Sequence, residues 1–347
     1  MGVFSTGGIG IDPGSANLTI CLENEGVVLR EPSLVLSLRD DTDDVLAVGR
    51  DARQMLGRTP KDVVLLSPVV DGAVGDVKLA TVLMQSLSEK ALGRRRPLEK
   101  NKIAVAMSQG VTRVERDALE SAVIGAGAKR AYIVRSTVAA AIGAGIDIEE
   151  PKGVMMVLIG AATTEVAVIS MNGIAAARSA RTGSIAIDEA IIRYLRREHN
   201  LIIGQRTAED LKLDVGSALP PESEEADEEV ILRGRDVVSG KPATVTVHVS
   251  DIHKAVLPQV EELLETIREA FENIPPELAA DIVERGIYLS GGGSLLTGLK
   301  PQLEKMLNLS VTQDEDPQDD VAKGLCLIAS DERLARKIMQ TGCLAEV

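Results

Sequence analysis

The chain has 347 residues, of which 45% are hydrophobic and 26% are charged, so it is not a wholly disordered protein and is long enough for two domains or one large one. Its 52 Asp and Glu residues outnumber 38 Lys and Arg residues, and the formal net charge of -14 disfavours indiscriminate binding to nucleic acid. With no Trp, three Tyr and two Phe, the chain lacks the rings for a base-stacking platform. We therefore expect no nucleic-acid partner.

Cysteine usage and hydropathy indicate the compartment. Cys21, Cys326 and Cys343 show no metal-ligand spacing and are too few for a disulfide framework, which fits a reducing cytoplasm. The opening segment MGVFSTGGIGID has no positively charged start and no continuous apolar run, and no stretch of about 18 uncharged apolar residues follows. We expect a cytoplasmic protein that is neither exported nor membrane-spanning.

The first part of the chain predicts a β-hairpin, a small lobe and then regular α/β structure. The segments GIGID, PGSAN and LTICLE read as strand, turn and strand. Short apolar runs broken by turns and charges over residues 26–76 are typical of a small subsidiary lobe. A helix over 77–92, a basic loop, the strand IAVAMS and a helix with the capping box Thr112-x-x-Glu115 follow.

A second unit of the same style starts near residue 154, which indicates a long-period internal repeat. A strand over 154–160 and the paired runs VAVISMNG and IAAARSA precede helices over 184–199 and from a Thr207 cap to 218. The acidic run ESEEADEE predicts a solvated loop, and the next segment predicts a hairpin. The remaining elements that we expect are a helix over 250–273 bent at Pro258, the strand GIYLS, the turn GGGS, a helix from Leu295, a helix over 319–335 and a frayed tail.

Two turns of small residues are candidate anion-binding sites. Asp12-Pro13-Gly14-Ser15-Ala16-Asn17 joins two strands, where backbone N–H groups can approach an anion and the Asp can hold a metal through water. Gly291-Gly292-Gly293-Ser294 separates a strand from a helix, where a ligand can lie against a chain without Cβ atoms. Taken alone, each segment also fits an ordinary turn. Glu209 and Lys212 share a helix face, which fits ligand binding or surface ion pairing.

Long segments in this order resemble the MreB-like bacterial actins, the rod shape-determining family. The resemblance covers nearly the whole chain, through EPSLVLSL, GRDARQMLGRTP, DGAVGD, AAAIGAG, TTEVAVIS, IGQRTAEDLK and PPELAADIVERGIYLSGGGSLLTGL. It implies an α/β protein with the actin-like ATPase fold, in which two RNase H-like domains, each with a smaller appended lobe, surround a cleft for ATP or ADP and Mg²⁺. It also implies a cytoskeletal protein of membrane-associated filaments that organise cell shape and the cell wall.

The resemblance also assigns domains and site residues. Domain I is expected at 1–142 plus 314–335 with a small lobe at about 30–76, and domain II at 143–313 with a small lobe at about 183–250, before a tail at 336–347. The implied nucleotide-binding positions are Asp12, Gly14, Ser15, Ala16, Asn17, Gly160, Ala161, Ala162, Thr163, Thr164, Glu209, Lys212, Gly291, Gly292, Gly293 and Ser294. Asp12 is also the implied support of the metal, through water.

The second phosphate loop departs from the family pattern D-I-G-G-G-T-T-E. Leu158 stands in place of the Asp that helps hold hydrated Mg²⁺, while Ala161 and Ala162 replace glycines that permit close approach and positive φ. Thr163 keeps the family residue. The Mg²⁺ site that the resemblance implies is therefore weakened.

Two further acidic positions of the family are also lost. The acid linked to water activation falls at Ser136, and a second cleft Asp falls at Ile185. Because such catalysis depends mainly on electrostatics and placement, we predict that nucleotide binding is retained and that ATP hydrolysis is weak or lost. Arg135 is either a solvent-facing charge, which we favour, or a substitute for part of the metal's charge.

Partners and rival functions follow from the same resemblance. We expect self-association into filaments, with other MreB-like copies and the membrane-bound cell-elongation machinery as further partners. The loop with Leu92, Arg94, Arg95, Arg96 and Leu98 is either solvated or a contact with anionic lipid at the inner membrane surface, worth about 1 kcal/mol per basic side chain. The alternatives are a nucleotide-independent scaffold and a rewired phosphotransferase of the same superfold, such as a sugar or acetate kinase. A chaperone-like ATPase is disfavoured because no substrate-binding domain follows residue 335.

Overall fold

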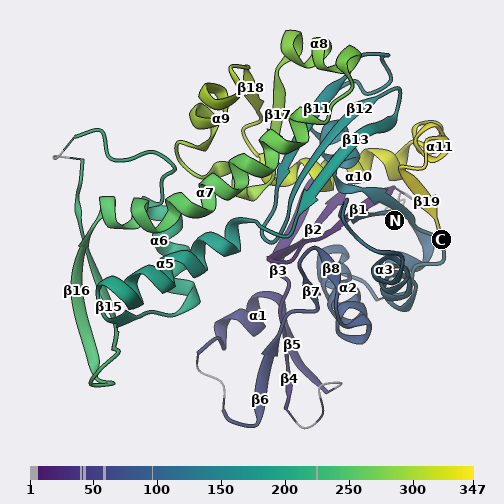
Figure 1. The fold of residues 1–347 in the computed structure, drawn as a ribbon. Coiled ribbons are helices and arrows are strands. Elements are labelled where there is room, and N and C mark those ends of the chain that lie inside the picture. Colours follow the sequence, from purple (N-terminus) through teal and green to yellow (C-terminus); the bar gives the residue numbers. More distant parts are fainter. Residues whose placement is uncertain (1–6, 40, 42–43, 58–59, 96, 224–225) are drawn as a thin grey trace.

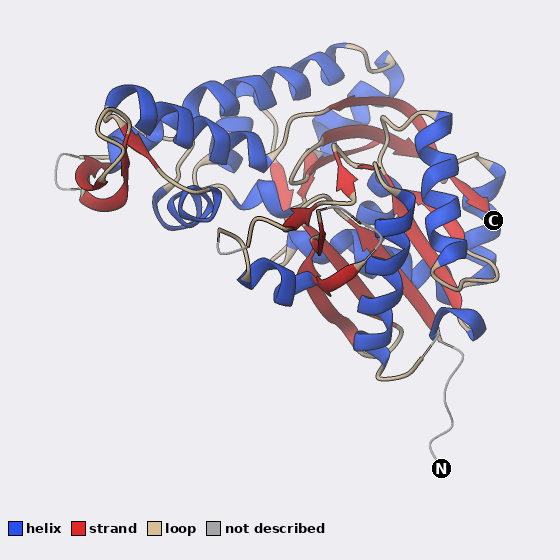
Figure 2. Cartoon of the chain, turned by 90° about the horizontal axis from the view of Figure 1, so that it is seen from below, coloured by secondary structure: helices blue, strands red, loops and turns tan. Residues whose placement is uncertain are grey.

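Two large β-sheets form the centre of the molecule (Figure 1). The computed structural model describes residues 7–39, 41, 44–57, 60–95, 97–223 and 226–347. The strand order is β19-β10-β9-β1-β2-β3 in one sheet and β13-β12-β11-β17-β18 in the other. Helices flank the strands of both sheets (Figure 2).

The first sheet begins with the predicted hairpin. Three antiparallel strands, β1 (Gly8–Pro13), β2 (Asn17–Leu22) and β3 (Gly26–Pro32), are joined by β9 (Lys102–Met107) and β10 (Tyr132–Arg135), which run parallel to β1. The helices α2 (Val77–Leu92) and α3 (Arg113–Gly125) share an aliphatic core with these strands. The predicted capping box of Thr112 and Glu115 is present at the start of α3.

The second sheet repeats this plan, which confirms the internal repeat. Antiparallel strands β11 (Val154–Ile159), β12 (Thr164–Ser170) and β13 (Gly173–Ala180) are followed by β17 (Ile287–Ser290) and β18 (Val311–Gln313), parallel to β11. Its core is closed by α5 (Ser184–Glu198), α6 (Gln205–Val215), α7 (Val249–Glu272), α8 (Pro276–Arg285) and α9 (Leu299–Leu307). Pro258 lies inside α7.

Two helices that cross at glycines join the halves. A Cβ on Gly143 of α4 (Ser136–Gly143) would lie 1.8 Å from the carbonyl oxygen of Asp320, and one on Gly324 of α10 (Asp320–Ser330) would lie 1.8 Å from that of Ala139. Only glycine allows the two backbones to come so close. The same core includes Ala104 of the first sheet and Met156 of the second, so the cleft between the sheets has a packed floor.

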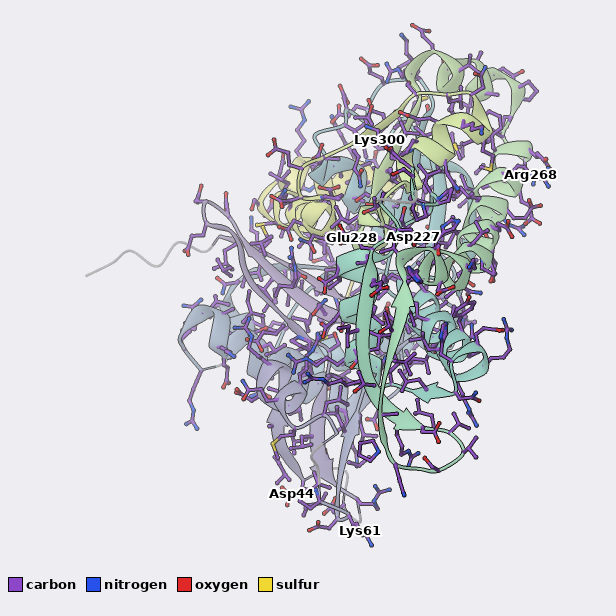
Figure 3. All side chains as sticks on the ribbon, turned by 90° about the vertical axis from the view of Figure 1, so that its left-hand side faces the viewer. Asp44, Lys61, Asp227, Glu228, Arg268 and Lys300 are labelled. Carbon is purple, nitrogen blue, oxygen red and sulfur yellow. The ribbon has the colours of Figure 1, made fainter. Side chains whose placement is uncertain are left out.

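Two small lobes extend from the central sheets. The first contains β4 (Val35–Leu38), β5 (Val45–Val48), β6 (Val63–Leu66) and α1 (Gly49–Gln54), and Asp44 and Lys61 lie at its free end (Figure 3). The second contains β14 (Leu201–Ile202), β15 (Glu229–Asp236) and β16 (Pro242–His248), with β15 and β16 forming the predicted hairpin. A short hairpin of β7 (Val69–Val70) and β8 (Ala73–Val74) reaches toward the cleft.

The end of the chain is ordered, so the expected frayed tail is wrong. Asp331 follows α10 and caps a separate helix, α11 (Glu332–Gln340), by accepting hydrogen bonds from two of its N–H groups. The strand β19 (Leu344–Glu346) then pairs with β10, and Ala131 and Val347 exchange backbone hydrogen bonds at 3.0 and 2.9 Å. An edge strand of three residues has too short an apolar pattern to be read locally.

Two helix starts also differ from expectation. The N-cap of α6 is Gly204, so Thr207 lies inside the helix and does not cap it. The GGGS turn continues into a 3-10 helix over Gly292–Leu295, and α9 begins only at Leu299. Of the acidic run ESEEADEE, residues 224–225 lie outside the described part, and Glu229 already belongs to β15.

The leucines of the basic loop after α2 pack in the protein core and are not available for contact with a membrane. Leu98 is 1% exposed in the 3-10 helix Pro97–Lys100, and Leu92 packs partly buried against the same core. Arg96 lies outside the described residues. The apolar half of the expected lipid contact is therefore wrong, because the leucines stabilise the fold. Within the described ranges, no helix is both long and apolar enough to cross a bilayer.

Candidate functional site

A cavity of about 400 Å³ lies in the cleft between the two halves. Its walls come from the β1–β2 turn, the β11–β12 turn, the start of α4, the helix α6 and the loop after β17. Of the predicted nucleotide-binding residues, those that line it are Asp12, Gly14, Ser15, Ala16, Asn17, Gly160, Ala161, Ala162, Thr163, Glu209, Lys212, Gly291, Gly292 and Gly293. The fold thus brings four distant sequence segments to one cavity.

Thr164 and Ser294 do not line the cavity. The Thr164 hydroxyl donates to the carbonyl oxygen of Thr182 at 2.7 Å, and its side chain is fully buried. The Ser294 hydroxyl donates to the carbonyl oxygen of Gly291 at 2.6 Å and accepts from the Gln313 amide at 2.8 Å. Both side chains hold the neighbouring loops in place.

The first loop is fixed by contacts from two other segments. The Ser33 hydroxyl donates to the Gly14 carbonyl oxygen at 2.5 Å, and the Gly72 N–H donates to the Ser15 hydroxyl at 3.0 Å. Gly72 has φ of +75°, and a Cβ there would lie 2.8 Å from a methyl carbon of Thr163. The turn between β7 and β8 therefore sits between the two predicted phosphate loops, where only glycine fits.

The second loop is anchored by the start of α5. The N–H groups of Ser184 and Ile185 donate to the carbonyl oxygens of Gly160 and Ala161 at 3.1 and 2.8 Å. Ala161 and Ala162 are not among the non-glycine residues with positive φ, so they cause no backbone strain. The positive φ that glycine would permit is not adopted here, and what the alanines add is two methyl groups at the cavity wall. The Ile185 side chain does not line the cavity.

Glu165 is a buried carboxylate behind this loop. It is 2% exposed and accepts hydrogen bonds from the Ser108 hydroxyl at 2.7 Å, the Gln109 N–H at 2.8 Å and the Thr163 hydroxyl at 3.2 Å. Burial raises its pKa, and these donors oppose the rise. Because its oxygens are occupied, Glu165 ties strand β12 to the loop after β9.

Arg135 is turned away from the cavity and is not the solvent-facing charge that we expected. One of its Nη atoms donates to the carbonyl oxygens of Ser108 and Gln109 at 3.1 and 3.3 Å. Burial lowers the pKa of the guanidinium. Arg135 does not line the cavity, so this structure gives no support to its use in place of a metal.

Glu209 and Lys212 pair with other elements and not with each other. Lys212 Nζ lies 2.8 Å from Asp188 Oδ1 and donates to the Ser184 carbonyl oxygen at 3.2 Å. Glu209 forms an ion pair with Arg53 of α1. The expected ion pair between them is therefore wrong, and both side chains line the cavity.

The third loop needs its glycines. Gly291 has φ of +87°, and a Cβ there would lie 2.3 Å from the carbonyl oxygen of Ile159. A Cβ on Gly293 would lie 2.5 Å from the Ile159 side chain. The loop therefore packs directly on the end of β11 and leaves its other side to the cavity.

Comparison with known proteins identifies this architecture. The family model described as MreB/Mbl protein matches residues 6–337. The chain belongs to the MreB/Mbl family. It is 39% identical over 316 residues to the cell shape-determining protein Mbl of Bacillus subtilis (strain 168), covering 91% of this chain and 93% of that protein. It is also 39% identical over 326 residues to the cell shape-determining protein MreB of Escherichia coli (strain K12), covering 93% of each.

Solved structures agree with the family assignment. The crystal structure of MreB5 of Spiroplasma citri bound to ADP superposes with a TM-score of 0.86 at 31% identity, covering 96% of this chain and 98% of that one. The structure of the same protein bound to AMPPNP gives 0.85 at 32% identity with the same coverage. The MamK double helical filament, at 0.74 and 18% identity over 93% of this chain and 98% of that one, shows the shared fold. The predicted actin-like fold is confirmed.

This MreB/Mbl family member has uncharged side chains at two of the positions where the family pattern has an acidic residue. Ser136, the first residue of α4, and Leu158, on β11, both line the cavity, and each is 7% exposed. The cavity wall at these points carries a hydroxyl and an isobutyl group. Neither can act as a carboxylate that orients water or supports a metal.

The residues at the phosphate loops fit Mg²⁺ poorly. Within the described part of the chain, no group of three or more His, Cys, Asp or Glu residues could hold a metal ion. Glu165 is occupied by its donors, which leaves Asp12 as the carboxylate beside the first loop. Burial and the charge of Glu165 raise the pKa of Asp12 to about 7, while the charge of Arg30 opposes this rise. A cation of the protein thus already faces the Asp that the resemblance assigns to the metal.

Sequence analysis missed several residues that line the cavity. Thr19, Arg30, Gly72, Ser108 and Gln318 are among them. Arg30 follows the apolar residues of the strand VVLREP and stands next to Glu31, and charges within such a strand are a usable signal. Its position beside Asp12, however, depends on the register of two hairpins, which the sequence pattern does not give.

Proposed function

We propose that this chain is a nucleotide-binding actin-like protein that binds ATP and ADP, forms or modulates filaments that determine cell shape, and hydrolyses ATP slowly or not at all. The observation that carries the proposal is the single cavity that all three glycine-containing loops and α6 line, together with Leu158 and Ser136 in its wall. The first part supports binding, and the second part argues against catalysis.

Nucleotide binding is supported from two directions. The structures of MreB5 bound to ADP and to AMPPNP match 96% of this chain. The loops at the cavity present small residues at Gly14, Gly160 and Gly292, so backbone N–H groups can approach phosphate oxygens. The methyl groups of Ala161 and Ala162 restrict the space for a terminal phosphate, so we expect ATP and ADP to bind with similar affinity.

Weak hydrolysis follows from what the cavity lacks. Phosphoryl transfer in this kind of site depends on a positioned water and on charge neutralisation by a metal. Ser136 and Leu158 supply no carboxylate for either task. The same absence disfavours a phosphotransferase, because a kinase of this superfold needs an acidic base near the γ-phosphate.

Filament formation and cellular location are proposed from the chain's membership of the MreB/Mbl family. Both curated relatives are named cell shape-determining proteins, and MamK of the same fold is known as a double helical filament. We propose self-association, other MreB-like copies and the membrane-bound cell-elongation machinery as partners, in the cytoplasm. With Leu92 and Leu98 packed in the fold, a contact with the inner membrane surface through this loop would rest on exposed charge such as Arg95.

One experiment separates the functions. ATP and ADP are titrated into the protein by calorimetry, and phosphate release is measured in parallel under polymerising conditions. We expect binding of both nucleotides and phosphate release close to the buffer control. Absence of heat with every adenine nucleotide would favour the nucleotide-independent scaffold. Rapid phosphate release would show that other side chains perform the catalysis in place of the lost acidic residues.

A further inference from the structure

Only two cationic residues among the described ones line the cavity, and they lie in different halves of the molecule. Lys212 on α6 is already paired with Asp188 at 2.8 Å. Arg30 on β3 belongs to the wall that carries the first phosphate loop. Four acidic residues line the same cavity, namely Asp12, Glu115, Glu165 and Glu209. An anionic ligand in such a cavity needs a source of positive charge.

The sheet register places Arg30 beside Asp12. Asp12 of β1 pairs with Thr19 of β2, and Thr19 pairs with Arg30 of β3. Directly paired residues of neighbouring antiparallel strands project on the same face, so the three side chains form a row across the sheet. Thr19 is short and 4% exposed, and the longer Arg30 side chain passes beside it toward the cavity.

The Arg30 guanidinium is held in place without being saturated. One Nη atom forms an ion pair with Asp319, which ends the 3-10 helix Pro317–Asp319, and the neighbouring Gln318 lines the cavity. The Nε atom is buried and has no hydrogen-bond partner among the described residues. A planar guanidinium fixed at one edge, with donors left over, is suited to bind two phosphate oxygens at once.

Arg30 lies beside Asp12, the residue through which the resemblance expects Mg²⁺ to be supported. Leu158 removes an acidic support of hydrated Mg²⁺, and Arg30 faces Asp12, the remaining one. A fixed guanidinium beside this carboxylate repels a divalent cation and attracts phosphate. The two features are therefore complementary, because one removes a support of the metal and the other provides positive charge in the same cavity.

We propose that Arg30 is a phosphate-binding residue that takes over the charge-neutralising role of Mg²⁺, so that nucleoside diphosphates and triphosphates bind to this chain without a divalent cation. The inference rests on the proposed nucleotide binding and adds a residue and an independence from metal that the family resemblance does not imply. Arg135 has no such role, since it donates to the backbone carbonyl groups of Ser108 and Gln109 and does not line the cavity.

The test is calorimetric titration of ADP and AMP into the full-length protein, once with EDTA and once with excess MgCl₂. For the unmodified protein, we expect the dissociation constant for ADP to agree within about threefold between the two conditions. Arg30→Gln should weaken ADP binding by roughly 10- to 100-fold in both conditions, because it removes a charge-assisted hydrogen bond to phosphate. AMP, which lacks the β-phosphate, should lose less affinity than ADP. Arg30→Lys should retain part of the ADP affinity, since the charge remains without the planar fork.

The matched control is Arg285→Gln. Arg285 also has one carboxylate partner, Glu150, and a similar side-chain exposure of 26% against 30% for Arg30, but it does not line the cavity. This variant should bind ADP like the unmodified protein. Circular dichroism melts check that each variant is folded. If Arg30→Gln is unfolded, Arg30→Lys and the unmodified protein in EDTA decide the question.

The outcomes separate this inference from the proposed function. ADP binding that is lost in EDTA, or that is unchanged in folded Arg30→Gln, overturns the role of Arg30 while leaving nucleotide binding intact. Absence of heat with both ADP and AMP in both conditions overturns the proposed nucleotide binding and this inference with it.

Discussion

Arg53 of α1 and Glu209 of α6 form an ion pair that joins the small lobe of the first half to the second half of the molecule. Glu209 lines the cavity, so the pair connects its two sides. The side chains are 35% and 33% exposed, and such a pair contributes only about 0–1 kcal/mol to the free energy of unfolding. Its effect should therefore be on the opening of the cleft more than on stability.

Replacing Arg53 tests this role. Arg53→Ala should increase the rate of ADP release by roughly two- to fivefold, because it removes a contact that the cleft must break to open. Stopped-flow displacement of a fluorescent ADP analogue measures this rate. Arg50→Ala, on the same helix and exposed, is the control and should release ADP at the unmodified rate. Equal release rates for both variants would show that the ion pair does not limit opening.

Filament assembly should not depend on turnover of nucleotide. Because Ser136 and Leu158 leave the cavity without the groups for hydrolysis, the same polymer should form with ATP and with a non-hydrolysable analogue. Light scattering gives the extent of assembly, and electron microscopy gives the appearance of the filaments. Assembly that occurs with ATP and fails with the analogue would contradict this prediction.

The buried carboxyl group of Asp320 should make stability fall with rising pH. Asp320 is 1% exposed, its Oδ2 accepts from the Ser290 hydroxyl at 2.7 Å, and burial raises its pKa to about 6. Since the folded pKa lies above that of the unfolded chain, the stabilisation is fully present below the unfolded pKa and is lost as the pH rises through 6. Asp320→Asn stays neutral and should gain about 1–2 kcal/mol relative to the unmodified protein between pH 5 and pH 8.

Urea denaturation at the two pH values measures this difference. Asp236→Asn is the control, because Asp236 is only partly buried and hydrogen bonds from Ser239 lower its pKa, so its titration is complete below pH 5. The difference in free energy of unfolding between variant and native protein should be the same at pH 5 and pH 8 for Asp236→Asn. For Asp320→Asn this difference should grow or change sign between the two pH values. A constant difference for both would mean that Asp320 is ionised throughout this range.

The sequence pattern within a short segment was enough to predict the helices and hairpins whose hydrogen bonds lie within that segment. The helix Val77–Leu92 and the capping box of Thr112 and Glu115 were predicted from apolar spacing and cap residues, and both are confirmed. The pairing of β15 with β16 follows from their alternation. In each case the hydrogen bonds that define the element lie within a short segment, so the sequence carries the information.

The sequence predictions are wrong where contacts with distant segments determine the position of a side chain or a strand. Arg135 binds carbonyl groups of the loop after β9, Leu98 packs under α2, and β19 joins β10 at the far end of the chain. None of these partners is visible in a window around the residue. Arg30 is the sharpest case, because only the combined register of β1, β2 and β3 brings it to Asp12.

The position of Arg30 should also determine whether substitutions in the cavity can restore ATP hydrolysis. Leu158→Asp and Ser136→Glu return two carboxylates to the cavity, and Ala161→Gly with Ala162→Gly removes two methyl groups from its wall. With Arg30 present, we expect this fourfold variant to release phosphate little faster than the native protein, because the guanidinium beside Asp12 still repels Mg²⁺. Adding Arg30→Gln should raise Mg²⁺-dependent phosphate release by about tenfold or more over the fourfold variant, since groups that act as a unit in catalysis are strongly non-additive.

The measurement is phosphate release with and without MgCl₂ for the native, fourfold and fivefold variants, after melts show that each is folded. The melts are needed because Leu158 is 7% exposed. A carboxylate at this buried position destabilises the folded protein unless water or a cation reaches it. The native protein with Arg30→Gln alone is the control and should remain inactive, since it lacks the carboxylates. Brisk Mg²⁺-dependent hydrolysis by the native protein, abolished by Asp12→Ala, would show instead that the cavity already contains a working catalytic group and that Arg30 does not keep the metal out.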